Sequence, residues 1–287
     1  MSKIIITGAS GFIGKVLRMK LVALGHEVIG IDSSNGDISD RKLFDQFESA
    51  KIEHVFHLAA KSFVPDSWND PLSFYETNVH GTHNVLEFCR KEGVNVTYVS
   101  SYLYGVPERL PISETDKISS NNPYAHSKYL AEQLCEFYSR EFNMHITVIR
   151  PFNIYGVGQR EIFLIPKIID LVRNESVVKV MDLIPKRDFL FIDDLVDALV
   201  LTMNNQNSFS VYNIGSGYSI SVKEIIDVIQ QQLHSNKPVE SEMQTRKNEI
   251  LDVIADISKA KKELGWIPKT TFEEGIKQMI KLLEEKK

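Results

Sequence analysis

Tyr124 and Lys128 have a spacing that suits proton-transfer chemistry. Four residues apart on a helix, a phenol and an amine lie on the same face. A nearby ammonium stabilises the phenolate, which lowers a tyrosine pKa from its ordinary value of about 10. Such a phenol takes a proton from an alcohol as hydride leaves, or returns one as hydride arrives. Because the same spacing also fits a simple contact on a surface helix, the context of the pair decides between the two interpretations.

Two serines upstream supply that context. A β-branched run ends in Ser100 and Ser101, which places their hydroxyls at the carboxyl end of an expected strand. Open α/β sheets bind their ligands at this edge. A hydroxyl there could hydrogen-bond a substrate oxygen and hold it against Tyr124. The serines therefore favour catalysis over a surface contact.

Three glycines predict a second site. Gly8, Gly11 and Gly14 follow a β-branched run and open a helical pattern, with the spacing GxxGxxG. Glycine permits a tight turn and a close approach of the backbone to a pyrophosphate, and the N–H groups at the helix start attract the anion. The order strand, glycine loop, helix is typical of dinucleotide binding, and the alternative is an ordinary β-to-α turn.

Asp32 strengthens the dinucleotide interpretation. It stands at the end of the second expected strand, where a carboxylate can accept hydrogen bonds from ribose hydroxyls. It would repel a 2′-phosphate, so NAD(H) is favoured, with NADP(H) kept open because Arg41 and Lys42 are near in sequence. Asp37 could reach the adenine amino group or cap the helix that follows.

The order of elements predicts an α/β fold. Short β-branched runs alternate with longer helical patterns in the first half, which indicates βαβ units around a parallel sheet. We expect a Rossmann-type doubly wound sheet in residues 1–150 and a smaller α/β lobe in 151–287, with residues 186–215 returning to the first domain. The expected strands are 3–7, 27–31, 54–58, 96–100 and 145–150, and the expected helices are 11–24, 40–50, 78–92 and 124–142.

Composition excludes several classes of protein. The chain has 287 residues, 43% of them hydrophobic and 25% charged, which is ordinary for a globular protein. Its 33 basic and 38 acidic side chains give a net charge of −5 without a basic block, so we expect no nucleic-acid partner. The sequence contains no apolar run long enough to cross a bilayer, so we expect no membrane partner.

Cysteines and histidines point to neither a disulfide framework nor a metal site. Cys89 and Cys135 lie far apart in helical patterns, so we expect two reduced, buried thiols in a cytoplasmic protein. His54 and His57 are three apart on an expected strand and so point to opposite faces, which prevents them from sharing a metal.

Seven ordered motifs run along nearly the whole chain. They are Gly8 with Gly11, Phe12, Ile13 and Gly14; His57 to Ala60; Asn78 to Thr82; Ser100 and Ser101 with Tyr104 and Gly105; Tyr124 with Lys128; Arg150 to Asn153 with Tyr155 and Gly156; and Arg187 to Phe189. Together they resemble the extended short-chain dehydrogenase/reductases of the NAD-dependent epimerase/dehydratase family, enzymes that act on nucleotide sugars. A late segment, residues 258–266, is similar to the C-terminal signature of that family.

The resemblance implies a role for each matching residue. Tyr124 would be the catalytic acid/base, Lys128 its pKa tuner and nicotinamide-ribose ligand, and Ser100 the ligand of the substrate hydroxyl. The C-terminal lobe would bind the nucleotide sugar. The cofactor residues would be Gly8, Gly11, Phe12, Ile13, Gly14, Asp32, Asp37, Ile38, Leu58, Ala59, Ala60, Asn78, Tyr124, Lys128 and Pro151, and the substrate residues Ser62, Ser101, Tyr102, Asn153, Arg187 and Arg246.

Two of the substrate residues have simpler alternatives, and a third is less secure. Asn153 could be a turn residue, and Arg187 could serve only to pair with Asp188 or Asp193. Arg246 lies in a polar stretch where its assignment depends on the resemblance alone.

The reaction is narrowed by Tyr102. Relatives that dehydrate or decarboxylate the sugar carry a glutamate at this position, two residues after Ser100, and without a carboxylate those reactions are disfavoured. The short segment after Asp32 and the sequence of residues 57–68 resemble the deoxysugar reductase branch. We therefore expect reduction of a 4-keto-6-deoxy nucleotide sugar, in carbohydrate biosynthesis, with 4-epimerisation as the alternative and a non-catalytic dinucleotide-binding protein as the third hypothesis. Biosynthetic reductases commonly use NADPH, so the NAD(H) preference expected from Asp32 conflicts with this assignment.

The resemblance also implies a homodimer. Relatives pair through two helices that here correspond to residues 78–92 and 124–142. Phe88, Phe137 and Tyr138 could supply apolar contacts to a partner or to the core of a single chain. Sequence alone determines neither the nucleotide, the sugar nor the stereochemistry at C4.

Overall fold

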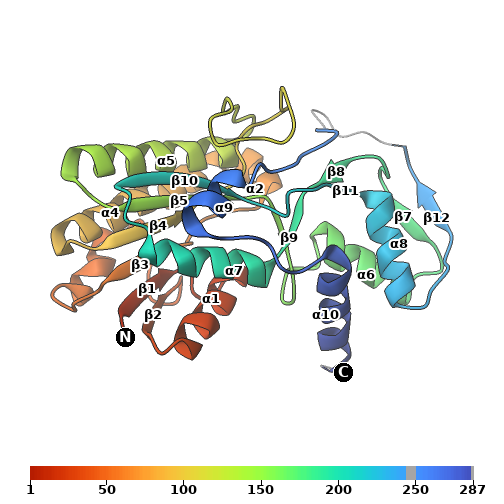
Figure 1. The fold of residues 1–287 in the computed structure, drawn as a ribbon, viewed down its shortest axis with the longest axis horizontal. Coiled ribbons are helices and arrows are strands. Elements are labelled where there is room, and N and C mark those ends of the chain that lie inside the picture. Colours follow the sequence, from red (N-terminus) through yellow and green to blue (C-terminus); the bar gives the residue numbers. More distant parts are fainter. Residues whose placement is uncertain (244–249, 286–287) are drawn as a thin grey trace.

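A parallel six-stranded sheet forms the centre of the protein in a computed structural model, which describes residues 1–243 and 250–285 (Figure 1). The strand order is β10-β5-β4-β3-β1-β2, and every neighbouring pair is parallel. The strands are β1 (Lys3–Thr7), β2 (Glu27–Ile31), β3 (His54–His57), β4 (Asn95–Val99), β5 (Ile146–Pro151) and β10 (Phe209–Ile214).

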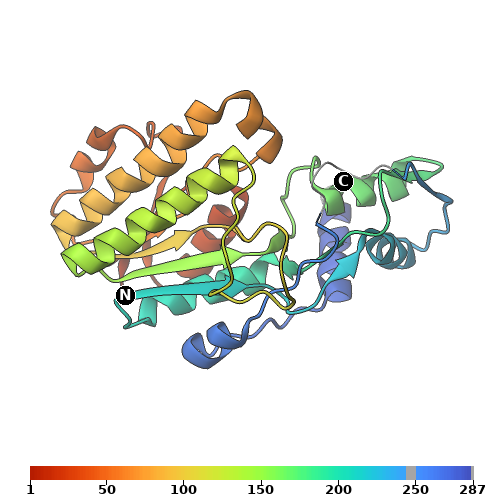
Figure 2. The same ribbon diagram turned by 90° about the horizontal axis from the view of Figure 1, so that it is seen from above.

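Helices cover both faces of this sheet because the strands are apolar on both sides. In β1, Ile5 packs in the core beneath α4 and α5, while Ile4 and Ile6 pack in the core beneath α1 and α7. Figures 1 and 2 show α4 and α5 side by side on one face and α1 and α7 on the other. The four helices are α1 (Phe12–Ala23), α4 (Gly81–Glu92), α5 (Pro123–Phe142) and α7 (Ile192–Leu201).

The expected Rossmann-type fold is thus confirmed, with strand ends shifted by a residue. The helix expected at residues 40–50 is wrong in type: residues Arg41–Phe47 form a 3₁₀ helix, η1. Only Leu43 and Phe44 of this segment are buried, which gives it too narrow an apolar face to hold a longer α-helix. A left-handed Ser49 follows it.

Smaller elements pack around the central sheet and its helices. A π-helix, η2, precedes α4, and the short helices α2 and α3 follow the loop after β3. Helix α9 packs against β10 and so belongs with the central sheet, as do β10 and α7 from the expected return segment. The bounds are α2 (Val64–Asn69), α3 (Pro71–Tyr75), η2 (Glu76–His80), η3 (Thr202–Asn204) and α9 (Ser258–Leu264).

The smaller lobe stands beyond the carboxyl ends of β5 and β10 (Figure 1). Helices α6, α8 and α10 share an apolar core that centres on Tyr155 and Phe272. Three two-stranded sheets, β6 with β9, β8 with β11 and β7 with β12, complete it. The bounds are β6 (Asn153–Tyr155), α6 (Leu164–Asn174), β7 (Val178–Val180), β8 (Lys186–Arg187), β9 (Phe189–Phe191), β11 (Ile220–Ser221), α8 (Val222–Gln232), β12 (Val239–Ser241) and α10 (Phe272–Glu284).

Two histidines are built into the core of the sheet. The His54 ring lies 2.8 Å from Thr97 Oγ1, and the His57 ring lies 2.7 Å from Thr7 Oγ1 and 2.9 Å from Thr82 Oγ1. Burial lowers the pKa of each to about 3. Cys89 and Cys135 are buried free thiols, as expected.

These histidines should make the protein sensitive to acid. Each folded-state pKa lies below the unfolded value, so the unfolded chain binds the extra protons and stability falls as the pH drops below about 6.5. In His57→Gln, the loss of unfolding free energy between pH 7 and pH 5 should be smaller by about 2 kcal/mol. Urea denaturation at both pH values measures this, and an unchanged loss would show that His57 is not buried in its neutral form.

Candidate dinucleotide and substrate site

The glycine loop leaves no room for side chains. Gly8 has φ +74°, and a Cβ built there would lie 2.8 Å from the Ala59 nitrogen in the loop after β3. A Cβ on Gly14 would overlap the Gly8 carbonyl oxygen. Helix α1 begins at Phe12, with Gly11 as its N-cap and neither a side-chain cap nor an acidic residue in its first turn. Its first N–H groups therefore suit a pyrophosphate.

The loop after β3 forms the opposite wall of this crevice. Thr7 holds it, since its carbonyl accepts the Leu58 N–H at 3.1 Å and its hydroxyl accepts the Ala59 N–H at 3.2 Å. Strand β1 lies between β2 and β3. The chain leaves β1 toward β2 at one edge of the sheet and leaves β3 toward β4 in the direction of the other edge, and the crevice opens between β1 and β3. A dinucleotide binds at such a position in open α/β sheets.

Asp32 ends the second strand as expected. Its carboxylate accepts the Ser34 N–H at 2.9 Å and the Ser34 hydroxyl at 2.6 Å, and these bonds lower its pKa. The carboxylate is therefore ionised at neutral pH. It fits the hydroxyls of an unphosphorylated ribose better than a 2′-phosphate.

The segment after Asp32 is fixed by local turns. Asp37 accepts the N–H and the hydroxyl of Ser39, both at 2.8 Å, whereas Asp40 caps η1 through the Lys42 N–H. Of the two roles considered for Asp37, the helix cap is therefore wrong, because that position is three residues farther on. Ile38 is buried, and Asn84 of α4 donates to its carbonyl at 3.1 Å.

Asn78 joins the loop after β3 to α5. Its amide oxygen accepts the Lys61 N–H at 2.8 Å, and its amide nitrogen donates to the Lys61 carbonyl and to the Ser127 hydroxyl. All its polar atoms are thus engaged in joining the loop after β3 to α5. Asn78 shapes the crevice through these bonds, within the π-helix η2.

The serines and the Tyr124–Lys128 pair meet at the carboxyl end of β4. Lys128 Nζ donates to the Val99 carbonyl at 2.7 Å, and the Ser101 side chain acts to lower the pKa of the Tyr124 phenol. Ser100 lies between Val99 and Ser101 in the chain. Its hydroxyl is buried and has no hydrogen-bond partner in the part of the chain that the structure describes. A buried hydroxyl of this kind fits a site for a substrate oxygen.

The electrostatics of the pair differ from the expectation. Burial lowers the pKa of Lys128 to about 7, against the opposing charge of Glu132, and its Nζ lies 4.2 Å from the centre of the Tyr98 ring. Burial raises the pKa of Tyr124, and Ser101 only partly offsets this. In the protein chain alone, Lys128 does not lower the pKa of Tyr124 as expected, because its amine is directed to the Val99 carbonyl. Tyr124 therefore stays protonated at neutral pH.

A buried ion pair supports this arrangement, and sequence reasoning overlooked it. Arg150 Nη2 lies 2.6 Å from Glu132 Oε2, with both side chains about 95% buried. Arg150 also donates to the Tyr104 hydroxyl, which donates to Asn213 on β10. Glu132 lies four residues after Lys128 and therefore on the same face of the helix. This continuation of the Tyr-Lys spacing was the sequence signal that could have drawn attention to Glu132.

The substrate candidates extend from β4 toward the smaller lobe. Tyr102 stacks on Phe152 with ring centres 5.3 Å apart, and Asn153 follows in β6. Arg187 of β8 donates to the Ile250 carbonyl, while the Asp188 carboxylate accepts three backbone N–H groups instead of serving mainly as an arginine partner. Ser62 is exposed in the loop after β3 and Pro151 ends β5. Arg246 lies outside the described residues.

Residues 1–243 and 250–285 contain no group of three or more His, Cys, Asp or Glu side chains arranged to hold a metal ion. Within the same ranges, none of the helices combines the length and the apolar composition that a bilayer crossing requires.

Comparison with known proteins identifies the family. The model of the NAD dependent epimerase/dehydratase family matches residues 4–215. The chain belongs to this family. It is accordingly an enzyme of the epimerase/dehydratase class, and the glycine loop, Tyr124 and Lys128 lie within the matched residues.

Similar members of the family differ in reaction. A putative UDP-glucose 4-epimerase of Methanocaldococcus jannaschii is 31% identical over 96% of this chain and 97% of its own. A GDP-6-deoxy-D-talose 4-dehydrogenase of Aggregatibacter actinomycetemcomitans is 32% identical over 92% of this chain and 91% of its own. The structure of RMD from Pseudomonas aeruginosa complexed with NADPH has a TM-score of 0.91 and 26% identity, with all of both chains covered. Other similar structures contain NAD.

Proposed function

We propose that this enzyme transfers hydride at C4 of a nucleotide-linked sugar, in the direction that reduces a 4-keto-6-deoxy sugar. The observation that carries the proposal is the buried hydroxyl of Ser100, which lacks a hydrogen-bond partner among the described residues and directly follows Val99, whose carbonyl binds Lys128. It stands at the same sheet edge as the glycine loop. The site therefore offers one hydrogen-bonding group and one proton donor for a single substrate oxygen.

Each residue has a defined task in this reaction. A nicotinamide dinucleotide bound along the Gly8–Gly14 loop would supply the hydride to C4. Tyr124 gives its proton to the carbonyl oxygen as that oxygen becomes a hydroxyl. Ser100 donates a hydrogen bond to the same oxygen, and Lys128 lies one helical turn from Tyr124 with its amine on the Val99 carbonyl.

One position in the site argues against elimination of water from the sugar. Tyr102 occupies the position where dehydratase relatives carry a glutamate, and its ring stacks on Phe152. The site therefore has no carboxylate there to remove a proton for elimination.

The second candidate is 4-epimerisation with a tightly held NAD. Asp32 favours it, because an ionised carboxylate disfavours the 2′-phosphate of NADP(H). The 31% identical putative UDP-glucose 4-epimerase is a further argument for it. The 32% identical 4-dehydrogenase of a GDP-6-deoxy sugar supports oxidoreduction without epimerisation.

Asp32→Ala should reveal which dinucleotide the site selects. Removing the carboxylate should weaken NAD(H) binding about tenfold through the loss of charge-assisted ribose bonds, with NADP(H) binding unchanged or tighter. Titration calorimetry with both dinucleotides measures the ratio. An equal effect on the two affinities would mean that Asp32 does not contact the ribose.

Release of the bound dinucleotide tests the reaction. Purified protein is denatured, and the released dinucleotide is identified by mass spectrometry with its redox state. For the reductase we expect little bound dinucleotide, and consumption of NADH or NADPH only when a 4-keto nucleotide sugar is present. Stoichiometric bound NAD⁺, with interconversion of UDP-glucose and UDP-galactose, would overturn the reductive assignment in favour of epimerisation.

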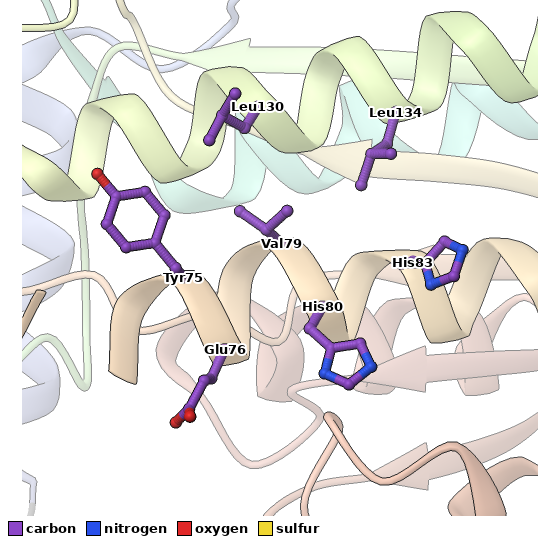
Figure 3. A pocket seen from close by; sticks show the side chains of 7 residues that line it. All are labelled: Tyr75, Glu76, Val79, His80, His83, Leu130 and Leu134. Atoms are coloured by element: carbon purple, nitrogen blue, oxygen red, sulfur yellow. The ribbon is translucent and has the colours of Figure 1, made fainter. Parts of the chain in front are cut away.

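We further propose that the enzyme is a homodimer. Figure 3 shows an open, mainly apolar groove between η2 with α4 and the facing side of α5. Phe137 and Phe142 are also exposed on α5, 46% and 43%, beyond the end of the groove. The groove is lined by Tyr75, Glu76, Val79, His80, His83, Leu130 and Leu134.

A charge in the groove should separate the protomers. Leu134→Glu should convert a particle of twice the 32.7 kDa chain mass into a monomer, because a carboxylate is costly to bury in an apolar interface. Met19→Glu, on the opposite face and 65% exposed, is the matched control. Light scattering measures both. A wild-type monomer, or a Leu134→Glu dimer, would contradict the proposal.

A further inference from the structure

Asp188 is a fully buried carboxylate at the junction of three segments of the smaller lobe. Its Oδ1 accepts the N–H and the hydroxyl of Ser216, at 2.6 and 2.7 Å. Its Oδ2 accepts the N–H groups of Gly217 and Ala255, both at 3.0 Å. One side chain thus holds the loop after β10 and the segment that leads to α9 against the start of β9.

The same residue fixes two of the substrate candidates. The Asp188 carbonyl accepts the backbone N–H of Asn153 at 3.0 Å and its side-chain amide at 3.1 Å. Arg187 precedes Asp188 directly, and its guanidinium donates to the carbonyl of Ile250. Asp188 holds the segment 250–255 through Ala255. That segment in turn supports Arg187 through the carbonyl of Ile250.

We propose that Asp188 is the positioning residue of the subsite for the nucleoside diphosphate of the substrate. This inference depends on the proposed function, because a nucleotide-linked substrate is proposed there and Asn153 and Arg187 are the substrate candidates beside Asp188. Asp188 does not touch the substrate. It sets the distance between Asn153 on one side and Arg187 with its supporting carbonyl on the other.

Packing around the carboxylate supports a positioning role. A Cβ on Gly215 would lie 2.8 Å from Asp188 Oδ2 and 2.6 Å from Ala255 Cβ, so the backbone is pressed against the carboxylate. The four donors to the carboxylate are three backbone N–H groups and one hydroxyl. Because three of the four donors are backbone groups, the carboxylate determines where each segment of the backbone lies.

Asp194 provides a matched control for a merely structural role. It is also buried, 3% exposed, and accepts the N–H groups of Lys269 at 3.1 Å and Thr270 at 2.9 Å. These bonds hold the segment before α10, which carries none of the substrate candidates. Asp194→Asn should therefore lower stability without changing the nucleotide subsite.

The experiment measures binding without turnover. UDP, GDP and dTDP are titrated into the full chain by calorimetry, together with NAD⁺, for the wild type and each variant. In Asp188→Asn the Kd of the nucleoside diphosphate that binds the wild type should rise about 10- to 100-fold, because an amide cannot accept four hydrogen bonds. The Kd for NAD⁺ should stay within about twofold, and Asp194→Asn should change neither Kd while lowering the melting temperature.

Ser216→Ala keeps the test decisive if Asp188→Asn does not fold. It removes a single donor to Asp188 and should raise the nucleoside diphosphate Kd about 3- to 10-fold. An unchanged Kd in Ser216→Ala and in any folded Asp188→Asn would overturn the inference alone. An equal loss in Asp194→Asn would also overturn it. A wild type that binds none of the three nucleoside diphosphates would overturn the proposed function and this inference with it.

Discussion

Tyr124→Phe should slow turnover about 10²- to 10⁴-fold, with the affinity for NAD⁺ within about twofold of the wild type. The substitution removes only the hydroxyl that would give its proton to the substrate oxygen. The ring remains, together with its edge contact to Phe74, in which the ring centres are 6.4 Å apart. The loss should therefore appear in kcat rather than in dinucleotide binding.

Tyr129→Phe is the control for Tyr124. It removes a phenol hydroxyl from the same helix, and its position five residues on points it away from Tyr124. Steady-state kinetics and calorimetric titration with NAD⁺ on both variants measure the two effects. Turnover by Tyr124→Phe at a rate close to that of the wild type would remove Tyr124 from the mechanism.

Gly8→Ala should weaken NAD⁺ binding about 10- to 100-fold. The backbone at Gly8 is left-handed, and the new methyl group would lie 2.8 Å from the Ala59 nitrogen and 3.0 Å from the Leu58 carbonyl carbon. Either the loop after β3 must move away or the glycine turn must open. Both changes displace the N–H groups that suit the pyrophosphate.

Gly25→Ala is the control that separates the effect of backbone strain from the effect of a close contact with a neighbouring loop. Gly25 is also left-handed, with φ +84°, but a Cβ there meets nothing within 4 Å. It should cost about 1 kcal/mol of stability and leave the Kd for NAD⁺ unchanged. Calorimetry and urea denaturation of both variants measure the difference. Equal Kd values for Gly8→Ala and the wild type would mean that the dinucleotide does not use this loop.

The first half of the fold was predictable because its signals are local. The β-branched runs, the glycine loop and Asp32 each lie within one βαβ unit, so their order along the chain specifies their arrangement in space. The Tyr124–Lys128 spacing likewise needs only one helix. Long-range packing was needed to know that Lys128 would be directed to Val99.

The smaller lobe was less predictable, for a physical reason. Its sheets are pairs of two- or three-residue strands from distant segments, such as β6 with β9 and β12 with β7, too short to show periodicity. The role of Asp188 depends on donors from residues 216, 217 and 255, far along the chain. The Arg150–Glu132 pair joins a strand to a helix, so the spacing of Glu132 from Lys128 places Glu132 on the helix face but does not identify Arg150 as its partner.

Transfer of labelled hydride tests the central claim most directly. The enzyme is supplied with NADH or NADPH carrying deuterium at the transferable position, and with dTDP- and GDP-linked 4-keto-6-deoxyhexoses. The proposed function predicts one deuterium at C4 of a 4-hydroxy product, seen by mass spectrometry and NMR, and a strongly reduced rate in Tyr124→Phe. An unlabelled sugar, with the dinucleotide unchanged, would contradict it.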